Sequence, residues 1–291
     1  MKIIKYFFEF ISVISLFSIF KIIGLKNASN LGDLLGRVFG PLFRSKNITK
    51  QNIKIGLGEI NEKDETEIIN GMWSNIGRTF AEYPFLRNFK LNTANPNHIK
   101  INGINYLDEI KKNNEPSIFF SGHFANFELM AMELEKFGIK CAAIYRPLNN
   151  FFLNPLMEYL RMKYICPNQI PKGRLGMREI IGKIKNGYSI ALMVDQRVSE
   201  GPRALFFNKP AHTTTIPAQL ALKYDCKLIP ISLERKVSTN FEMTIHSPYK
   251  IKKTGNDEND TKEITLKINK IIEEMIIKNP KQWIWSHNRW K

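Results

Sequence analysis

The stretch from Ser121 to Glu128, Ser-Gly-His-Phe-Ala-Asn-Phe-Glu, has the residue types that acid–base chemistry needs. Four residues separate a histidine, His123, from a glutamate, Glu128. On one ideal helix these two side chains would point apart, but they can meet if His123 lies in a loop and Glu128 in the first helical turn. Gly122 permits the tight turn that this arrangement requires. The spacing therefore predicts a histidine in contact with a carboxylate.

Such a pair would act as a general base. The carboxylate accepts a hydrogen bond from one imidazole N–H, which leaves the other ring nitrogen free to take a proton from a hydroxyl group. The carboxylate would also stabilise the imidazolium that forms, and no covalent enzyme intermediate is needed if the hydroxyl attacks its target directly. A histidine that caps the helix beside an exposed glutamate would show the same spacing, so the surrounding elements have to separate the two interpretations.

Predicted strands and helices alternate along the chain. Apolar runs predict buried strands at 117–120, 140–145 and 189–194 and an antiparallel pair at 227–234 and 241–246. Helical periodicity predicts helices at 65–86, 125–137, 152–164, 176–186, 215–224 and 262–278, with a polar loop at 253–262. This alternation is typical of an α/β fold with a mostly parallel central sheet flanked by helices. His123 would follow a buried strand, where active sites gather in open α/β sheets.

Other chemistries find no support in the motifs. There is no GxSxG elbow, HExxH zinc motif, P-loop or GxGxxG after a strand. Cys141, Cys166 and Cys226 are scattered, which argues against a disulfide framework and indicates a reducing compartment. Cys141 and Cys226 lie in apolar stretches and are predicted core residues, while His212 and His246 stand alone. We therefore expect neither a metal nor a cofactor.

The chain is strongly basic. It has 291 residues, enough for one large domain or two small ones, and a net charge of +16. Such a surface suits an anionic partner, although a composition rich in Lys, Ile and Asn would give part of the charge without one. The basic residues are spread along the chain without a nucleic-acid-binding motif, so nucleic acid is not an expected partner.

Residues 3–24 form the most apolar segment. Its charge-free run extends only from Phe10 to Phe20, between Glu9 and Lys21, and a spanning helix needs about 20 apolar residues. The segment therefore either spans a membrane with its charges near the interfaces or lies in the interface as an amphipathic anchor. A buried core helix is the remaining alternative.

This segment divides the chain into two predicted parts. Residues 1–24 are the membrane anchor or interfacial helix, and residues 25–291 are the α/β domain. An apolar patch at Phe39 to Phe43 would lie near the bilayer as well. Basic residues close to the segment favour a cytoplasmic location for the domain: Lys21, Lys26, Arg37, Arg44 and Lys46.

An ordered set of motifs resembles the bacterial lipid A biosynthesis acyltransferases, a family of lauroyl and myristoyl transferases. The similar blocks follow the apolar amino terminus and are Met72 to Pro84, Gly122 to Leu129, Tyr145-Arg146-Pro147 with the helix that carries Arg161, Asp195-Gln196, Phe206 to Ala211, and Pro280 to Lys291. The resemblance covers nearly the whole chain, and the ordered set is more specific than any single block.

The resemblance implies a glycerolipid-acyltransferase-like fold and transfer of a fatty acyl chain. The donor would be a thioester of acyl carrier protein, and the acceptor a hydroxyl of a lipid A precursor at the cytoplasmic face of the inner membrane, with anionic lipid as a further partner. By position, His123 is the base and Glu128 its partner. The expected substrate-binding residues are Arg146, Arg161, Asp195 and Gln196. An arginine there could stabilise an oxyanion or hold a lipid phosphate.

The chain departs from the family pattern at two positions beside the expected substrate groove. Asn208 stands where glycine is frequent, and His212 where proline is common. The tryptophans Trp283, Trp285 and Trp290 suit either the core or a membrane interface.

Three other functions stay open to different degrees. A glycerol-phosphate acyltransferase would need a phosphate-binding block of the FPEGT kind, which is absent. Transfer to another glycolipid or phospholipid acceptor fits the same motifs. A non-catalytic protein that binds membranes or anionic partners would explain the charge but not the context of His123 and Glu128.

Overall fold

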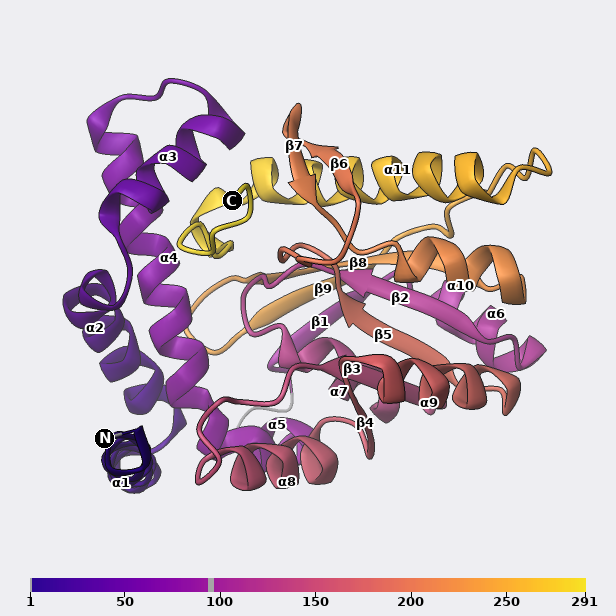
Figure 1. The fold of residues 1–291 in the computed structure, drawn as a ribbon. Coiled ribbons are helices and arrows are strands. Elements are labelled where there is room, and N and C mark those ends of the chain that lie inside the picture. The colour runs from indigo at the N-terminus through magenta and orange to yellow at the C-terminus, as the bar shows by residue number, and fades with distance from the viewer. Residues whose placement is uncertain (1, 94–96) are drawn as a thin grey trace.

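The computed structural model describes residues 2–93 and 97–291, and their centre is a seven-stranded sheet in the order β1-β9-β8-β2-β5-β3-β4 (Figure 1). The strands are β1 (Ile99–Asn102), β2 (Ser117–Ser121), β3 (Cys141–Tyr145), β4 (Asn168–Pro171), β5 (Ser189–Met193), β8 (Lys227–Arg235) and β9 (Phe241–Ile245). Strands β8, β2, β5, β3 and β4 are parallel, and β9 with β1 runs the other way. The predicted α/β fold with a mostly parallel sheet is confirmed, and so is the antiparallel pair.

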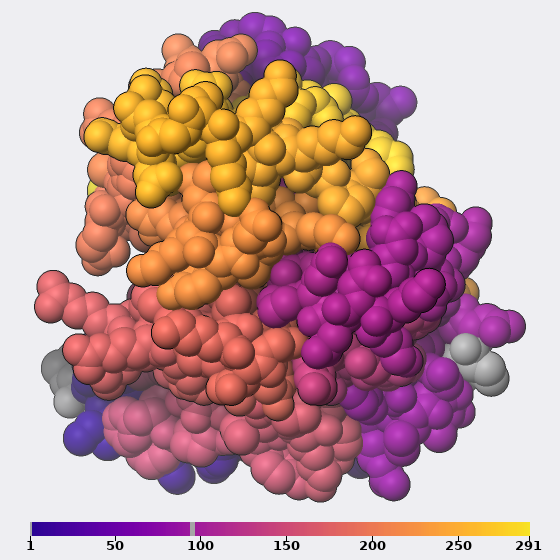
Figure 2. Space-filling model, turned by 90° about the vertical axis from the view of Figure 1, so that its right-hand side faces the viewer, coloured from indigo at the N-terminus to yellow at the C-terminus, as the bar shows by residue number. Residues whose placement is uncertain are grey.

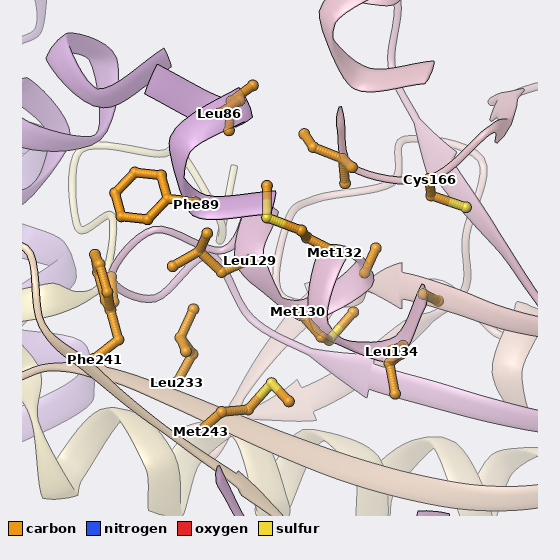
Figure 3. Close-up of a cluster of buried hydrophobic side chains, with 14 of the residues drawn as sticks. Leu86, Phe89, Leu129, Met130, Met132, Leu134, Cys166, Leu233, Phe241 and Met243 are labelled. Carbon is orange, nitrogen blue, oxygen red and sulfur yellow. The ribbon is translucent and has the colours of Figure 1, made fainter. Parts of the chain in front are cut away.

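Helices cover both faces of the sheet because the central strands are apolar on both sides. In β2, Phe119 packs with the helices of one face, whereas Ile118 and Phe120 pack with those of the other. The first face carries α5 (Leu86–Leu91), α6 (Ile104–Asn113), α7 (Glu128–Lys136) and α8 (Asn154–Tyr164), and the second carries α9 (Arg174–Lys185), α10 (Ile216–Tyr224) and α11 (Asp257–Lys278). Figure 3 shows the core of the first face, where Leu129 and Met132 of α7 lie near Leu86 and Phe89.

Helices cover the end of the molecule that lies farthest from the amino-terminal helices. Figure 2 shows this end, where the magenta surface of α6 lies beside the orange surface of α10 and the yellow surface of α11. Cys141, Cys166 and Cys226 are all buried as free thiols, which confirms the core positions expected for Cys141 and Cys226.

Two predicted helix boundaries are wrong for local reasons. Helix α7 begins at Glu128 and not at 125. Ala125 has a φ of 48°, which is outside the right-handed helical region, so the helix can begin only after it. Helix α11 begins at Asp257, inside the predicted loop 253–262. The side chain of Asn256 caps it by accepting a hydrogen bond from the amide of Asn259 at 3.1 Å, and acidic residues fill its first turn.

Four helices precede the sheet: α1 (Lys2–Ile23), α2 (Leu25–Phe43), α3 (Lys46–Leu57) and α4 (Glu62–Glu82), followed by the short helix η1 (Tyr83–Phe85). The backbones of helices α2 and α4 come into close contact where glycines face each other. A Cβ at Gly32 would lie 2.4 Å from the carbonyl oxygen of Gly77, so only glycine permits this approach. These helices stand as a column at one end of the sheet (Figure 1).

Helix α1 lies mostly outside the core. Only Phe17 and Phe20 are buried, so α1 is not the buried core helix that the sequence left open. Among the described residues it is the one helix long and apolar enough to cross a membrane. Its acidic residue, Glu9, accepts a hydrogen bond from Asn150 at 3.0 Å and lies 3.8 Å from Lys5.

The carboxy-terminal tryptophans belong to the core. Trp283 and Trp285 are 1% and 0% exposed, which decides between the two locations that the sequence allowed. The hairpin of β6 (Arg203–Phe206) and β7 (Lys209–His212) packs over them. Asn208 lies in its turn with a φ of 56°, a conformation that glycine and asparagine adopt most easily.

Candidate active site

The candidate site lies where four neighbouring parallel strands end. Strands β2, β5, β3 and β4 are adjacent, so the segments that leave their carboxyl ends meet at one edge of the sheet (Figure 1). The polar residues on these segments are His123 after β2, Asp195 and Gln196 after β5, Arg146 after β3 and Lys172 after β4. The order of the strands therefore assembles residues that are far apart in the sequence.

His123 is held by Asp195 through two contacts. The imidazole Nδ1 lies 2.7 Å from Asp195 Oδ1, and the His123 backbone amide donates to Asp195 Oδ2 at 3.0 Å. The indole of Trp283 donates to the same Oδ2 at 2.8 Å. An ionised carboxylate accepts hydrogen bonds only, so Nδ1 carries the proton of the neutral ring and Nε2 is left unprotonated.

The environment keeps Asp195 ionised. Burial by itself would raise its pKa, but the charge and hydrogen bonds of His123, together with the Trp283 bond, outweigh burial and lower the pKa to about 2. The carboxylate is 2% exposed, so its charge is available mainly to the imidazole.

The free ring nitrogen faces the cavity. His123 Nε2 lies 3.4 Å from the side-chain nitrogen of Gln196, and the ring packs edge-on against Phe127 with centroids 4.7 Å apart. Gln196 therefore lies beside the reactive nitrogen, as a substrate-binding residue would.

Glu128 contacts other residues than the one expected. The prediction that it accepts a hydrogen bond from His123 is wrong, because its Oε1 accepts from Arg161 at 2.6 and 3.0 Å and from the hydroxyl of Tyr83. The turn before α7 aims His123 towards the end of β5, whereas Glu128 at the start of the helix points towards η1 and α8. Two carboxylates thus flank the same loop, and Asp195 is the one that meets the imidazole.

Arg161 stays protonated in its ion pair with Glu128. Burial by itself would lower the pKa of Arg161, but Glu128 and Tyr83 raise it. Burial, followed by the charge of Glu128, raises the pKa of Tyr83 well above its ordinary value. Arg161 also lies over the ring of Tyr145, 5.8 Å from its centroid. Arg161 and Tyr83 therefore keep their protons near neutral pH.

A cavity of about 250 Å³ joins these residues. His123, Glu128, Arg146, Arg161 and Gln196 all line it, so five of the six predicted site residues share one space, and Asp195 lies behind His123. Its apolar wall is made by α7, β3, β5 and the end of α8, with Met130, Ala131, Ala143, Ile165, Ala191 and Met193. Asn208 and His212, expected beside the substrate groove, are not among the lining residues.

Sequence reasoning missed three basic or titratable residues of this cavity: Lys172, Arg197 and His287. Burial, and then the charge of Arg146, lower the pKa of Lys172, while Glu200 opposes this shift. Lys172 follows β4 in the same way as Arg146 follows β3, but β4 was not among the predicted strands, so the rule that sites lie at carboxyl ends had no strand to act on here. His287 lies in the Pro280 to Lys291 block, so the motif set pointed to its segment without giving this residue a role.

His287 is a neutral acceptor. Its Nε2 accepts a hydrogen bond from the backbone amide of Arg197 at 3.0 Å. Burial lowers its pKa to about 4, although the charge of Asp195 opposes the shift. Among the residues that the structure describes, no cluster of His, Cys, Asp and Glu is suited to hold a metal ion.

The arrangement can remove a proton from a hydroxyl group beside an apolar wall. The whole sequence, residues 1–291, matches the family described as bacterial lipid A biosynthesis acyltransferase. Similar proteins include the lipid A biosynthesis palmitoleoyltransferase of Escherichia coli (strain K12), 23% identical over 271 residues that cover 90% of this chain and 84% of the relative.

Two more relatives are similar over comparable lengths. A lipid A biosynthesis acyltransferase of Haemophilus influenzae is 25% identical over 273 residues, covering 88% of this chain and 83% of the relative. The lipid A biosynthesis lauroyltransferase of Escherichia coli (strain K12) is 22% identical over 255 residues, covering 85% and 79%. The family match over the full length shows that this chain belongs to the bacterial lipid A biosynthesis acyltransferases.

Proposed function

We propose that the protein transfers a fatty acyl chain from an acyl-carrier-protein thioester to a hydroxyl of a lipid A precursor, with His123 as the general base. The observation that supports this most directly is the His123–Asp195 pair, whose free Nε2 faces an apolar-walled cavity. The names of the relatives, a palmitoleoyltransferase and a lauroyltransferase, supply the substrate class.

The reaction takes place in one displacement through a tetrahedral intermediate. Nε2 of His123 takes the proton from the acceptor hydroxyl as its oxygen attacks the thioester carbonyl. The C–O bond forms, the C–S bond breaks, and the proton on Nε2 passes to the leaving thiolate. Asp195 keeps the ring in the tautomer that leaves Nε2 free and stabilises the imidazolium that forms between the two steps.

The cavity walls suggest where the substrates lie. The apolar wall of α7, β3 and β5 suits the acyl chain, and the Gln196 amide beside Nε2 is placed to donate to the thioester oxygen. Arg146 and Lys172 stand on the segments after β3 and β4, where they would bind a phosphate of either substrate. Glu128 would contribute by fixing Arg161 in the wall, and not by contacting the base.

The amino terminus supports a membrane location. We propose that residues 1–24 form an anchor and that residues 25–291 form the catalytic domain on the cytoplasmic face of the inner membrane. Helix α1 exposes about half of its apolar side chains and buries only Phe17 and Phe20, and Leu42 and Phe43 at the end of α2 are each 78% exposed. Such a patch is typical of membrane contact. The net charge of +16 would add attraction to anionic lipid.

The decisive experiment uses purified full-length protein in mixed micelles with an acyl-acyl carrier protein and a lipid A precursor. Mass spectrometry should detect a product heavier by one acyl group, and His123→Ala should abolish it in a protein that still folds. Acylation of a different glycolipid, with none of the lipid A precursor, would support the alternative acceptor. Absence of any acyl transfer, together with binding to anionic vesicles, would support the non-catalytic alternative.

A separate measurement tests the anchor. Sedimentation with liposomes across a salt series should show that the intact protein resists high salt, because an apolar insertion is not screened. Deletion of residues 1–24 should leave only binding that weakens with salt, since exposed charges are screened over about 8–10 Å at moderate ionic strength. Equal pelleting of both proteins at high salt would place the anchor elsewhere.

A further inference from the structure

One face of α4 forms hydrogen bonds to Ala125 and Asn126, in the loop between β2 and α7 that carries His123. Asn75 and Thr79 both donate to the carbonyl oxygen of Ala125, each at 3.0 Å. Glu82 accepts from the side chain of Asn126 at 2.9 Å. The three α4 positions follow helical spacing, so they share one side of the helix. They belong to the Met72 to Pro84 block, which the proposed reaction leaves without a role.

The backbone of the loop between β2 and α7 is strained at Ala125, so contacts from outside the loop are needed to stabilise it. Ala125 has a φ of 48°, in the left-handed region that disfavours any residue with a Cβ. It lies two residues after His123, whose own amide must point at Asp195. If Ala125 returned to an ordinary conformation, the direction of the chain through His123 would change.

The donors of α4 are themselves fixed by a buried arginine. Arg235 donates to Asn75 Oδ1 at 3.1 Å, to Thr79 Oγ1 at 3.4 Å and to Glu82 Oε2 at 3.0 Å. Asn75, Thr79, Glu82 and Arg235 are each less than a tenth exposed. Water therefore cannot easily replace a lost partner, and each donor has a defined direction.

We propose that Asn75, Thr79 and Glu82 are positioning residues that hold Ala125 in its left-handed conformation and thereby keep His123 against Asp195. The two donors to the Ala125 carbonyl satisfy it only in this conformation, and Glu82 fixes the next residue. Helix α4 thus determines the geometry of the base without touching the cavity. This inference deepens the proposed function and relies on it where turnover is the measurement.

Thr79→Val is the sharpest test, because it removes the donor and almost preserves the shape. We expect kcat to fall about tenfold with KM nearly unchanged, since a misplaced base affects the transition state more than substrate binding. Thr79→Ser retains the hydroxyl and should keep most of the turnover. If Thr79→Val does not fold, Asn75→Ala removes the other donor and should show the same division between kcat and KM.

Rescue by glycine separates positioning from ordinary destabilisation. Glycine adopts a φ near 48° without the Cβ penalty, so Ala125→Gly added to Thr79→Val should recover several-fold in kcat. Because removing the Cβ penalty also stabilises the fold as a whole, kcat is compared at a temperature where every variant is fully folded, so that a loss that comes only from unfolding disappears. The inference is overturned if the double variant is as slow as Thr79→Val alone.

Ser29→Ala is the matched control. Ser29 is fully buried and donates to Glu82 Oε1 at 2.8 Å, on the side of the network away from the loop. It should lower the thermal midpoint as Thr79→Val does while leaving kcat near that of the unmodified protein. An equal fall in kcat for both variants would show that the network acts through stability alone and would contradict the proposal.

A measurement without acyl transfer keeps this inference apart from the proposed function. The His123 side chain is 18% exposed, so diethyl pyrocarbonate can modify it, and peptide mass spectrometry can follow the rate. Thr79→Val should change the rate of His123 modification at least threefold, Ser29→Ala should not, and Ala125→Gly should restore it. An unchanged rate in Thr79→Val would refute the positioning role even if the chain proved to have another activity.

Discussion

Two carboxylates flank the loop between β2 and α7, and their surroundings give them different chemistry. Asp195 faces an imidazole whose other nitrogen opens into the cavity, so a proton can enter and leave the pair. Glu128 faces a guanidinium and a phenol whose pKa values are both raised, so these two partners keep their protons. A carboxylate close to the base in sequence is thus not necessarily its partner, because the partner is decided by which cation the fold brings to it.

The largest effect is expected from a substitution that breaks the His123–Asp195 pair. Asp195→Asn should lower kcat by about 10³–10⁴, because the amide can hold the ring in the wrong tautomer and no longer stabilises the imidazolium. Steady-state kinetics of the folded variant measures this. Combined with His123→Ala the losses should not add, since the two residues act as a unit. A fall in kcat of less than tenfold would show that Asp195 is not the functional partner of His123.

Breaking the second pair should affect stability more than chemistry. Glu128→Gln leaves Arg161 buried without a counter-charge, which typically costs about 3–5 kcal/mol in the free energy of unfolding. The double variant Glu128→Gln, Arg161→Met should recover part of that loss because no buried charge remains. Denaturant unfolding measures both. If folded Glu128→Gln lost as much turnover as Asp195→Asn, the distinction between the two carboxylates would be wrong.

The neutral histidine behind the cavity should make stability depend on pH. The folded-state pKa of His287, about 4, lies below its ordinary value of 6.5, so between these values the unfolded chain binds a proton that the native state does not. The free energy of unfolding should therefore fall as pH drops from 6.5 towards 4, by about 3 kcal/mol from this group. His287→Gln, which still offers an acceptor to Arg197, should flatten the curve over this window. Parallel curves for the two proteins would rule out His287 as the titrating group.

The smallest effect concerns the indole that supports Asp195. Trp283→Phe removes one hydrogen bond to Oδ2, worth about 1 kcal/mol, and should lower kcat about three- to tenfold. Trp285→Phe is the matched control, because its indole donates to the Pro280 carbonyl at 2.7 Å and does not reach Asp195. Equal losses of kcat in both variants would mean that core packing, and not the bond to Asp195, explains the effect.

The sequence by itself determined the fold class and the place of His123, the proposed base, but it missed strands β1 and β4. Apolar runs of strand length, separated by helical periodicity, were sufficient to predict a mostly parallel sheet, because burial on both faces leaves a continuous apolar pattern, but the order of the strands came from the structure. The Ser-Gly-His turn after that strand identified His123, and the motif set identified five of the residues that line the cavity. These are local signals, carried by neighbours in the chain.

Only the tertiary structure decided the partner of His123. The spacing of His123 and Glu128 allowed contact, but the left-handed Ala125 moves the helix start to Glu128 and turns the two side chains apart. The phenol of Tyr83 and the guanidinium of Arg161 then meet Glu128, while β5, adjacent to β2, brings in Asp195. A conformation that costs energy at one residue, and contacts between segments far apart in the sequence, have no local pattern, which is why the sequence could not decide between the two carboxylates.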